Sequence, residues 1–517
     1  MRFIQISLTV LTFLFFRTAS SETRLSAKND DNNTVDSEVI AGLDNIYNLR
    51  FNEAETIFRN IQKSYPSDLR GFFYESLIYF YKALPTRDNA MFDKYISLSE
   101  TVIQKAEKLL EKDETNFDAM YYKGLSHSYR SLLMLSLNKS LLKAASNGND
   151  GYRILTALTE RNPQYYDAYM GLGLYKIALG FVPEKFKWLL SMIGFSGNIS
   201  EGMNLLKKSL ANGHYTKTDS KVFLSIFSLG EKEYDDRQSL VFSKELTEEY
   251  PESPIFKIFY SGILLQSGRS EDAVNIADFA IEQNNYSFKD EIIKAASSIK
   301  GSAYFRMNDY QKCIENLELY MNYVNKEDRY NVYLFTLGAA YELQGNRQKA
   351  LDKYKNVRND FINERDGELD RFFYRYAQKR IKSPINDFDK QLIIGMNLRE
   401  SNKFSEAIEL YKKLSGSIES GNAYTQDEKI RLYYDLGVAY TYVKEFGKAA
   451  ECFSKCIRLN PEEEKWLLPH SYFELGKIYY KQNEKKKAEE MFESVYNYDD
   501  FDFESFLEMR LANFISK

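Results

Sequence analysis

The sequence has few residues of the kinds that build covalent or metal-bound sites. Its 517 residues include Cys 3, His 3, Trp 2 and Pro 9. Three cysteines exclude a disulfide-rich scaffold, and three histidines leave little material for metal binding or general-base catalysis. His127, His214 and His470 lie far apart in the chain, and the sequence contains no HExxH, Walker A or nucleophile-elbow motif. We therefore predict no enzyme activity, no metal site and no cofactor.

An excess of positive charge is also missing. The chain has 69 Lys and Arg residues and 74 Asp and Glu residues, which gives a net charge of −5. Without a basic block the chain lacks the electrostatic footprint of a nucleic-acid-binding protein. What the sequence does have is apolar material, 44% of the residues, with Tyr 40 and Phe 36. This composition favours large cores and a helical binding or structural protein.

The first 21 residues have the features of a secretory signal peptide. Arg2 gives a basic start, an apolar run extends from Phe3 to Phe16, and small residues precede a cleavage site after Ser21. The apolar run is shorter than the about 20 residues of a membrane span. We expect export, to the periplasm or envelope of a bacterium or otherwise into the secretory pathway; an uncleaved anchor is the alternative. Residues 22–37 are polar and predict a flexible linker.

A repeated pattern organises the rest of the chain. The clearest copy occupies residues 433–461 and consists of Tyr433, Leu436, Gly437, Tyr440, Ala449, Phe453 and Pro461. Its spacing places Leu436 and Tyr440 on one face of a first helix, while Gly437 allows a second helix to come close. The same pattern recurs around Gly338 and Gly476.

Weaker copies extend the pattern over most of the chain, and no strand-type alternation interrupts it. We predict an all-α solenoid of about eleven helix-pair units. Pro384 should end a helix, so we place a domain boundary there, between a region at 38–384 and a region at 385–517. An apolar insertion at 177–199 interrupts the first region.

On these motifs the chain resembles the tetratricopeptide repeat superfamily from about residue 35 to residue 502. The resemblance implies a right-handed superhelix whose first helices line a concave groove, and a protein-interaction scaffold rather than a catalyst. Residues 165–250 resemble a narrower family, whose eukaryotic members include mitochondrial outer-membrane-associated proteins, through Gly171-Leu-Gly173, Trp188 and Gly202. The Lys and Asn residues by which some scaffolds of the superfamily grip a C-terminal carboxylate are not found at the matching places.

Aromatic and basic residues at the groove-facing places are our candidates for partner binding. Such side chains are common interface anchors because they bury a large area at low entropic cost. The alternative is that neighbouring turns of the solenoid cover them. The candidates are Phe305, Arg306, Phe335, Tyr434, Tyr442, Phe473, Lys477, Tyr480 and Lys481.

The insertion has two interpretations. Its apolar side chains, together with two lysines, fit an interfacial helix that contacts lipid, or they fit a core segment or a plug of the groove. We favour the core or plug because the basic face holds only two lysines. The residues concerned are Phe186, Trp188, Leu189, Met192 and Phe195.

Three short motifs have structural interpretations. Cys313, Cys452 and Cys456 occupy small packing places of the repeat, where cysteine behaves as a small apolar residue. The runs Glu462–Glu464 and Lys485–Lys487 are predicted to be solvated faces.

The function that follows is an exported, non-enzymatic scaffold that binds a protein or peptide in its concave groove. Attachment to a membrane surface through residues 177–195 is one alternative, and glycan binding through exposed tyrosines is the other. The sequence identifies neither the partner nor the oligomeric state.

Overall fold

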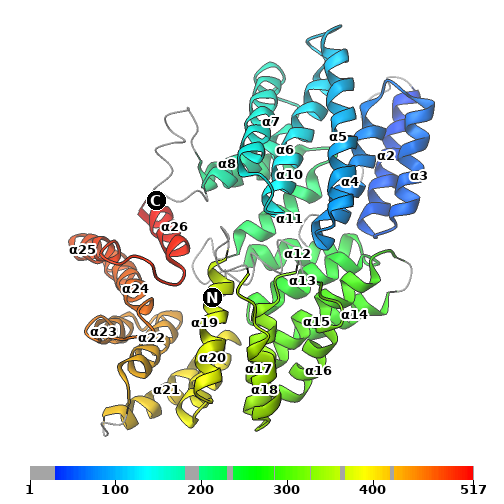
Figure 1. The fold of residues 1–517 in the computed structure, drawn as a ribbon. Helices are drawn as coiled ribbons and strands as arrows, with labels where there is room; N and C mark the ends of the chain where they lie inside the picture. Colours follow the sequence, from blue (N-terminus) through cyan, green and yellow to red (C-terminus); the bar gives the residue numbers. More distant parts are fainter. Residues whose placement is uncertain are drawn as a thin grey trace. The chain divides into compact units, whose positions relative to one another are not determined.

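The computed structural model describes residues 30–180, 197–229, 237–283, 286–325, 328–360, 367–419 and 424–515. Every regular element in these ranges is an α-helix, and there are 24 of them, which confirms the all-α prediction. The described residues divide into two compact units, and each is described by itself (Figure 1). Unit 1 contains the described parts of 30–266 and 272–296, and unit 2 contains those of 267–271 and 297–515.

Consecutive helices of unit 1 pack against each other as antiparallel neighbours. The helices are α2 (Asp30–Tyr47), α3 (Phe51–Ser64), α4 (Leu69–Thr86), α5 (Asn89–Leu110), α6 (Phe117–Ser136), α7 (Leu141–Arg161), α8 (Ala168–Gly180), α10 (Ile199–Asn212), α11 (Lys217–Ser228), α12 (Arg237–Glu249) and α13 (Pro254–Gln266). Most of α14 (Ser270–Glu282) and the first half of α15 (Lys289–Arg306) also belong to this unit.

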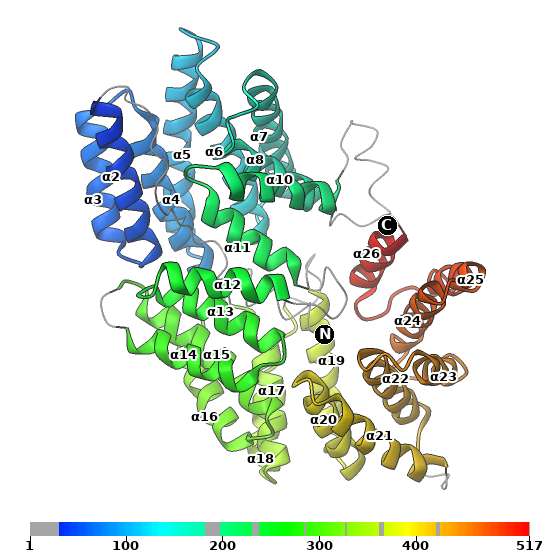
Figure 2. The same ribbon diagram turned by 180° about the vertical axis from the view of Figure 1, so that it is seen from behind.

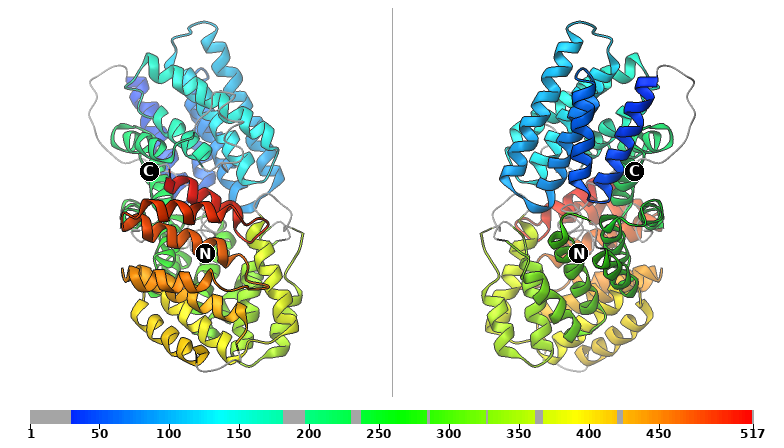
Figure 3. Two further views of the ribbon diagram at one scale, coloured as in Figure 1. Left: turned by 90° about the vertical axis from the view of Figure 1, so that its left-hand side faces the viewer. Right: turned by 90° about the vertical axis from the view of Figure 1, so that its right-hand side faces the viewer.

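Unit 2 continues with the second half of α15. Its helices are α16 (Tyr310–Met321), α17 (Asn331–Leu343), α18 (Arg347–Lys355), α19 (Glu368–Lys382), α20 (Asp387–Glu400), α21 (Phe404–Glu419), α22 (Gln426–Tyr442), α23 (Phe446–Cys456), α24 (Leu467–Lys481), α25 (Lys485–Val495) and α26 (Glu504–Ile515). From α19 to α26 the helices are stacked in chain order (Figures 2 and 3).

Local sequence explains where these helices begin and turn. The Asn386 side chain accepts a hydrogen bond from the backbone N–H of Asp389 at the start of α20. Thr425 and Glu428 form a capping box at the start of α22. Five turns between paired helices of unit 2 place one residue in the left-handed region, where a side chain is usually unfavourable. These residues, with their φ angles, are Asn308 (60°), Gly345 (83°), Asn402 (60°), Lys444 (64°) and Asn483 (64°).

A glycine facing an aromatic ring joins the two helices of each clear repeat. A Cβ atom added to Gly476 would lie 2.5 Å from the Phe492 ring. One added to Gly338 would lie 2.6 Å from the Tyr354 ring. Contacts under 3.0 Å are closer than real Cβ atoms come, so the helices pack at this distance only because the side chain is missing. The repeat pattern therefore sets the spacing of the helix pair.

The cysteines lie in the packed interior, as predicted from their places in the repeat. Cys313 and Cys456 are fully buried and Cys452 nearly so. All three are free thiols. Burial raises the pKa of Cys452 to about 12, so its thiol stays protonated near neutral pH.

Three expectations about organisation can be set beside the structure. Residues 30–37, assigned to a flexible linker, form the first turns of α2. Pro384 connects α19 to α20 inside unit 2, whereas units 1 and 2 divide between residues 266 and 297. Residues 181–196, which hold most of the apolar insertion, lie outside the described residues. Among the described helices, none combines the length and the apolar character needed to cross a membrane.

The close contact at Gly476 predicts a large effect of a small substitution. Gly476→Ala should lower the stability of the chain by about 1–3 kcal/mol, because the new methyl group collides with the Phe492 ring. The matched control is Gly447→Ala in α23, where a Cβ atom would meet nothing within 4 Å. That change should be neutral or stabilising by up to about 1 kcal/mol through helix propensity. Urea unfolding followed by circular dichroism measures both, and equal effects would contradict the spacing role of Gly476.

Candidate functional site

The predicted partner-binding residues all lie in unit 2, but they differ in how far solvent reaches them. Phe473, Lys477 and Arg306 are 1%, 3% and 7% exposed, so their side chains belong to the interior. Four more are half-buried, and only two are exposed at the surface. The half-buried residues are Phe305, Phe335, Tyr434 and Tyr442, and the exposed ones are Tyr480 and Lys481.

The burial of Phe335 comes from a helix that sequence reasoning did not place against it. Helix α19 brings Phe373 and Tyr376 to ring-centre distances of 5.4 Å and 6.2 Å from Phe335. Tyr434 is covered in the same way, since the Phe453 ring lies 5.7 Å and the Trp466 ring 6.3 Å away. Intramolecular contacts therefore occupy the first-helix face at these two places.

Lys477 and Phe473 belong to a buried charged group of α24 and α26. The Lys477 Nζ lies 2.5 Å from Glu474 and 4.9 Å from the centre of the Phe473 ring. Arg510 lies 3.4 Å from Glu474, and its guanidinium carbon lies 4.8 Å from the centre of the Phe473 ring. Because both cations pair with Glu474 within the unit, we assign this group to the fold rather than to a ligand.

The remaining candidates are anchored at the C-terminal ends of the first helices. Tyr442, at the end of α22, stacks on Phe404 with ring centres 4.5 Å apart. Phe305, near the end of α15, lies 5.7 Å from the Tyr310 ring. Each aromatic side chain is held by the start of a second helix, which orients it without covering it fully.

Tyr480 and Lys481, at the end of α24, are the most accessible candidates. Tyr480 is 47% exposed, and its ring lies edge-on to Phe514 at 5.1 Å. The Lys481 Nζ stands 5.4 Å over the Phe446 ring at the start of α23. These two residues are the exposed members of the predicted set.

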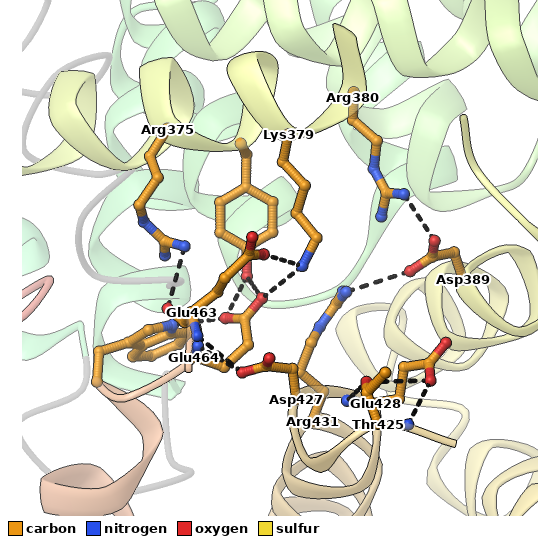
Figure 4. Close-up of polar contacts among 12 residues, drawn as sticks. Arg375, Lys379, Arg380, Asp389, Thr425, Asp427, Glu428, Arg431, Glu463 and Glu464 are labelled. Carbon is orange, nitrogen blue, oxygen red and sulfur yellow. Dashed lines mark hydrogen bonds and ion pairs between the residues drawn. The ribbon is translucent and has the colours of Figure 1, made fainter. Parts of the chain in front are cut away.

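A second polar cluster, centred on Glu464, holds α19 in place (Figure 4). Glu464 is fully buried, and both its carboxylate oxygens accept hydrogen bonds from the Tyr376 hydroxyl, at 2.7 Å and 2.6 Å. The Trp466 indole N–H donates to the same carboxylate at 2.9 Å. Lys379 lies 3.6 Å from Glu464 and 2.7 Å from Glu463. A segment just before α24 is thereby tied to a helix 88 residues earlier.

Positive charge keeps this carboxylate ionised. Burial raises the pKa of Glu464, but the charge of Arg431 and the Tyr376 hydroxyl, with smaller help from nearby cations, lower the pKa by more. The net pKa is therefore below its ordinary value. Arg431 also lies 3.3 Å from Asp389, which Arg380 contacts at 2.6 Å, so the charges alternate in sign across α19, α20 and α22.

This cluster corrects one interpretation of the sequence. The run Glu462–Glu464 was predicted to be a solvated face, yet only Glu462 and Glu463 are exposed. The acidic run by itself carries no signal that Glu464 differs, because its partner Tyr376 lies far away in the chain. The run Lys485–Lys487 is exposed, as expected.

The remaining features concern histidine protonation and metal binding. His470 is buried between Trp466 and Phe501, and burial together with nearby cations lowers its pKa well below the ordinary value, so it stays neutral. No cluster of three or more metal-ligating side chains occurs among the described residues. The insertion residues Phe186, Trp188, Leu189, Met192 and Phe195 lie outside the described residues.

Neighbouring carboxylates allow a matched test of the cluster. Glu464→Gln should destabilise the chain by about 3 kcal/mol, because it removes the charge of a fully buried carboxylate and leaves the partly buried cations around it without their counter-charge. Glu463→Gln, at a side chain 54% exposed, should cost less than about 0.5 kcal/mol. The Glu464 contribution requires the ionised form and a depressed pKa, so it is present above pH 4.5 and lost as pH falls through the lower folded-state pKa. Urea unfolding at several pH values measures this, and equal costs for the two variants would refute the anchoring role.

Comparison with known proteins places the chain among repeat proteins. The family model described as Iml2/Tetratricopeptide repeat protein 39 matches residues 167–383, and tetratricopeptide repeat models match 430–463 and 469–501. The chain is similar to tetratricopeptide repeat protein ttc-39B of Caenorhabditis elegans, with 22% identity over 376 residues. That alignment covers 66% of this chain and 62% of the relative, so the chain spans less than two thirds of the relative's length.

Similarity to solved structures is weaker. The human IFIT1 dimer with PPP-AAAA has 13% identity and a TM-score of 0.38, covering 84% of this chain and 96% of that one. The P58(IPK) TPR domain has 12% identity and a TM-score of 0.21, covering 86% and 99%. Scores this low support no inference about a ligand. The family matches nevertheless agree with the motifs and the paired helices: the chain is a tetratricopeptide repeat protein with an Iml2/tetratricopeptide repeat protein 39 region at residues 167–383.

Proposed function

We propose that the chain is a non-catalytic scaffold that binds a protein or peptide partner on the first-helix face of unit 2. The contact is made at the C-terminal ends of α22 and α24, where Tyr442, Tyr480 and Lys481 lie. All three matching family models describe repeats of a kind that typically bind proteins, which supports the general role. The finer placement is our own proposal.

The observation that carries this placement is the exposure of Tyr480. Most large aromatic side chains of unit 2 are buried or covered by α19, α26 and Trp466, whereas Tyr480 leaves 47% of its surface to solvent. Phe514 contacts the ring edge-on from one side, which limits the positions that the ring can take. A half-exposed Tyr restricted in this way is the kind of side chain that contributes strongly to binding, because little entropy is lost on contact.

Affinity capture tests this proposal. Tagged chain should recover a defined protein from native extract, identified by mass spectrometry, and Tyr480→Ala should reduce recovery about tenfold or more. Tyr496→Ala is the matched control, because Tyr496 is 56% exposed but lies at the end of α25, a second helix. Both variants should keep the helical content of the unmodified chain. Equal recovery by Tyr480→Ala and the unmodified chain would refute the placement, and recovery of lipid or glycan alone would favour the alternatives named above.

We also propose that the chain is exported, on the basis of residues 1–21. N-terminal sequencing of the protein purified from fractionated cells of its source tests this. The expected result is a chain that starts at Glu22 in the exported fraction. Recovery of the chain with Met1 intact in the cytoplasmic fraction would refute export.

A further inference from the structure

Unit 2 presents a row of lysines where the first helices turn into the second. The turn between α22 and α23 and the turn between α24 and α25 come together, since the Lys481 Nζ stands 5.4 Å over the Phe446 ring. We use the name lysine edge for six of the exposed residues in and beside these two turns, where Glu445, Gln482, Asn483 and Lys487 are exposed as well. The lysine edge consists of Val443, Lys444, Tyr480, Lys481, Lys485 and Lys486.

The acidic residues of these two turns are already neutralised locally. Glu445 lies 3.3 Å from Lys448, and Glu484 lies 2.5 Å from Lys487. Within the described residues, no ion pair involves Lys444, Lys485 or Lys486. Glu489 and Glu490 follow one turn further along α25. Lys444, Lys485 and Lys486 therefore carry positive charge that the acidic residues of the two turns do not neutralise.

The backbone at Lys444 differs from that of the other turns of unit 2 in the residue type it holds. Lys444 has a φ of 64°, in the left-handed region. The corresponding places in four other turns of unit 2 hold Asn or Gly, residues that tolerate this conformation (Asn308, Gly345, Asn402 and Asn483). A lysine there costs stability on the order of 1 kcal/mol. Leu49 and Arg87 adopt the same backbone geometry in turns of unit 1, so the angle sets Lys444 apart only among these five turns of unit 2.

Two apolar groups lie among these lysines. Val443 is 37% exposed and Tyr480 is 47% exposed, and they end neighbouring first helices. A membrane-binding surface requires a continuous apolar helix face with several large side chains. Val443 and Tyr480 are only two partly exposed groups at helix ends. They fit contact with one or two side chains of a bound protein segment better than contact with a membrane.

We infer that the lysine edge binds an acidic, extended segment of a protein partner, with an aromatic or aliphatic residue of that segment on Tyr480. This inference rests on the proposed function and specifies the chemistry of its partner. The lysines supply attraction and orientation, and the tyrosine supplies the buried contact. Because the contact is largely electrostatic, added salt weakens it.

The test uses the full chain and a defined probe. The probe is a fluorescein-labelled peptide of alternating Glu and Asp with one central Trp, and fluorescence anisotropy measures its affinity at low and raised salt. The triple variant Lys444→Glu, Lys485→Glu and Lys486→Glu should weaken binding at least about tenfold. The matched control reverses the same number of charges at Lys382, Lys390 and Lys413, exposed lysines outside these turns, and should bind as the unmodified chain does.

Several results would overturn the inference. They are equal weakening by the two triple variants, no weakening by either, absence of peptide binding, and binding of an otherwise identical Gln and Asn peptide with the same affinity. Stronger binding to phosphatidylserine vesicles than to the peptide, lost with the same lysines, would replace the protein partner by a membrane. If circular dichroism shows that the charge-reversal variant does not fold, the Lys→Gln triple takes its place with the same expectation.

The two proposals fail in distinguishable ways. Loss of protein capture in Tyr480→Ala, together with unchanged affinity in the lysine variant, would leave the scaffold function standing and refute the acidic partner. Capture that persists in both variants would refute the placement of the site itself.

Discussion

The arrangement of the three clearest helix pairs depends on the absence of one side chain in each. Gly338, Gly437 and Gly476 lie in first helices, opposite Tyr354, Phe453 and Phe492 in the paired second helices, at distances that no Cβ atom tolerates. A glycine in a helix interior lowers stability by about 1 kcal/mol relative to alanine. The closer packing of the two helices offsets this loss of helix stability. Once that contact is made, the remaining faces of both helices are oriented. Everything on the first-helix face follows from it.

That orientation turns many aromatic and charged side chains inward, and their partners come from distant parts of the chain. Tyr376 and Lys379 of α19 reach Glu464, and Arg431 completes the balance of charge. A buried carboxylate without these groups would be costly, and so would the buried cations without the carboxylate. The interior of unit 2 is therefore a mutually dependent set. It ties α19 to the segment before α24 and to α22.

The sequence predicted the parts of the structure that depend on short spacing. The helix pairs around Gly338, Gly437 and Gly476 were predicted from residues within one repeat, because a period of 3.6 residues decides which side chains share a helix face. The same reasoning assigned residues to a first-helix face but could not show what covers them. Phe473 and Lys477 occupy groove-facing places of the pattern and are nevertheless buried, because α26 packs over them.

Coverage of this kind depends on contacts between residues far apart in the chain. Tyr376 and Glu464 are 88 residues apart, and no sequence motif contains both residues. Within the acidic run itself, no local sequence feature distinguishes Glu464 from its exposed neighbour Glu463. The left-handed place at Lys444 is an intermediate case. The repeat pattern predicts that Lys444 lies in the turn. The unfavourable backbone conformation of Lys444 becomes evident only when the φ angles of five turns are compared.

The distribution of strain and exposure separates structural roles from binding roles in unit 2. Side chains that support the fold are buried and have internal partners, as Lys477 does with Glu474. Side chains at the turns have fewer internal partners and less favourable backbone geometry, as Lys444 has. A scaffold built from stacked pairs can vary its turns without disturbing its cores, because each turn contributes little to the packing between helices. Recognition by unit 2 is therefore expected at the ends of the helices, where the chain departs from its own repeat.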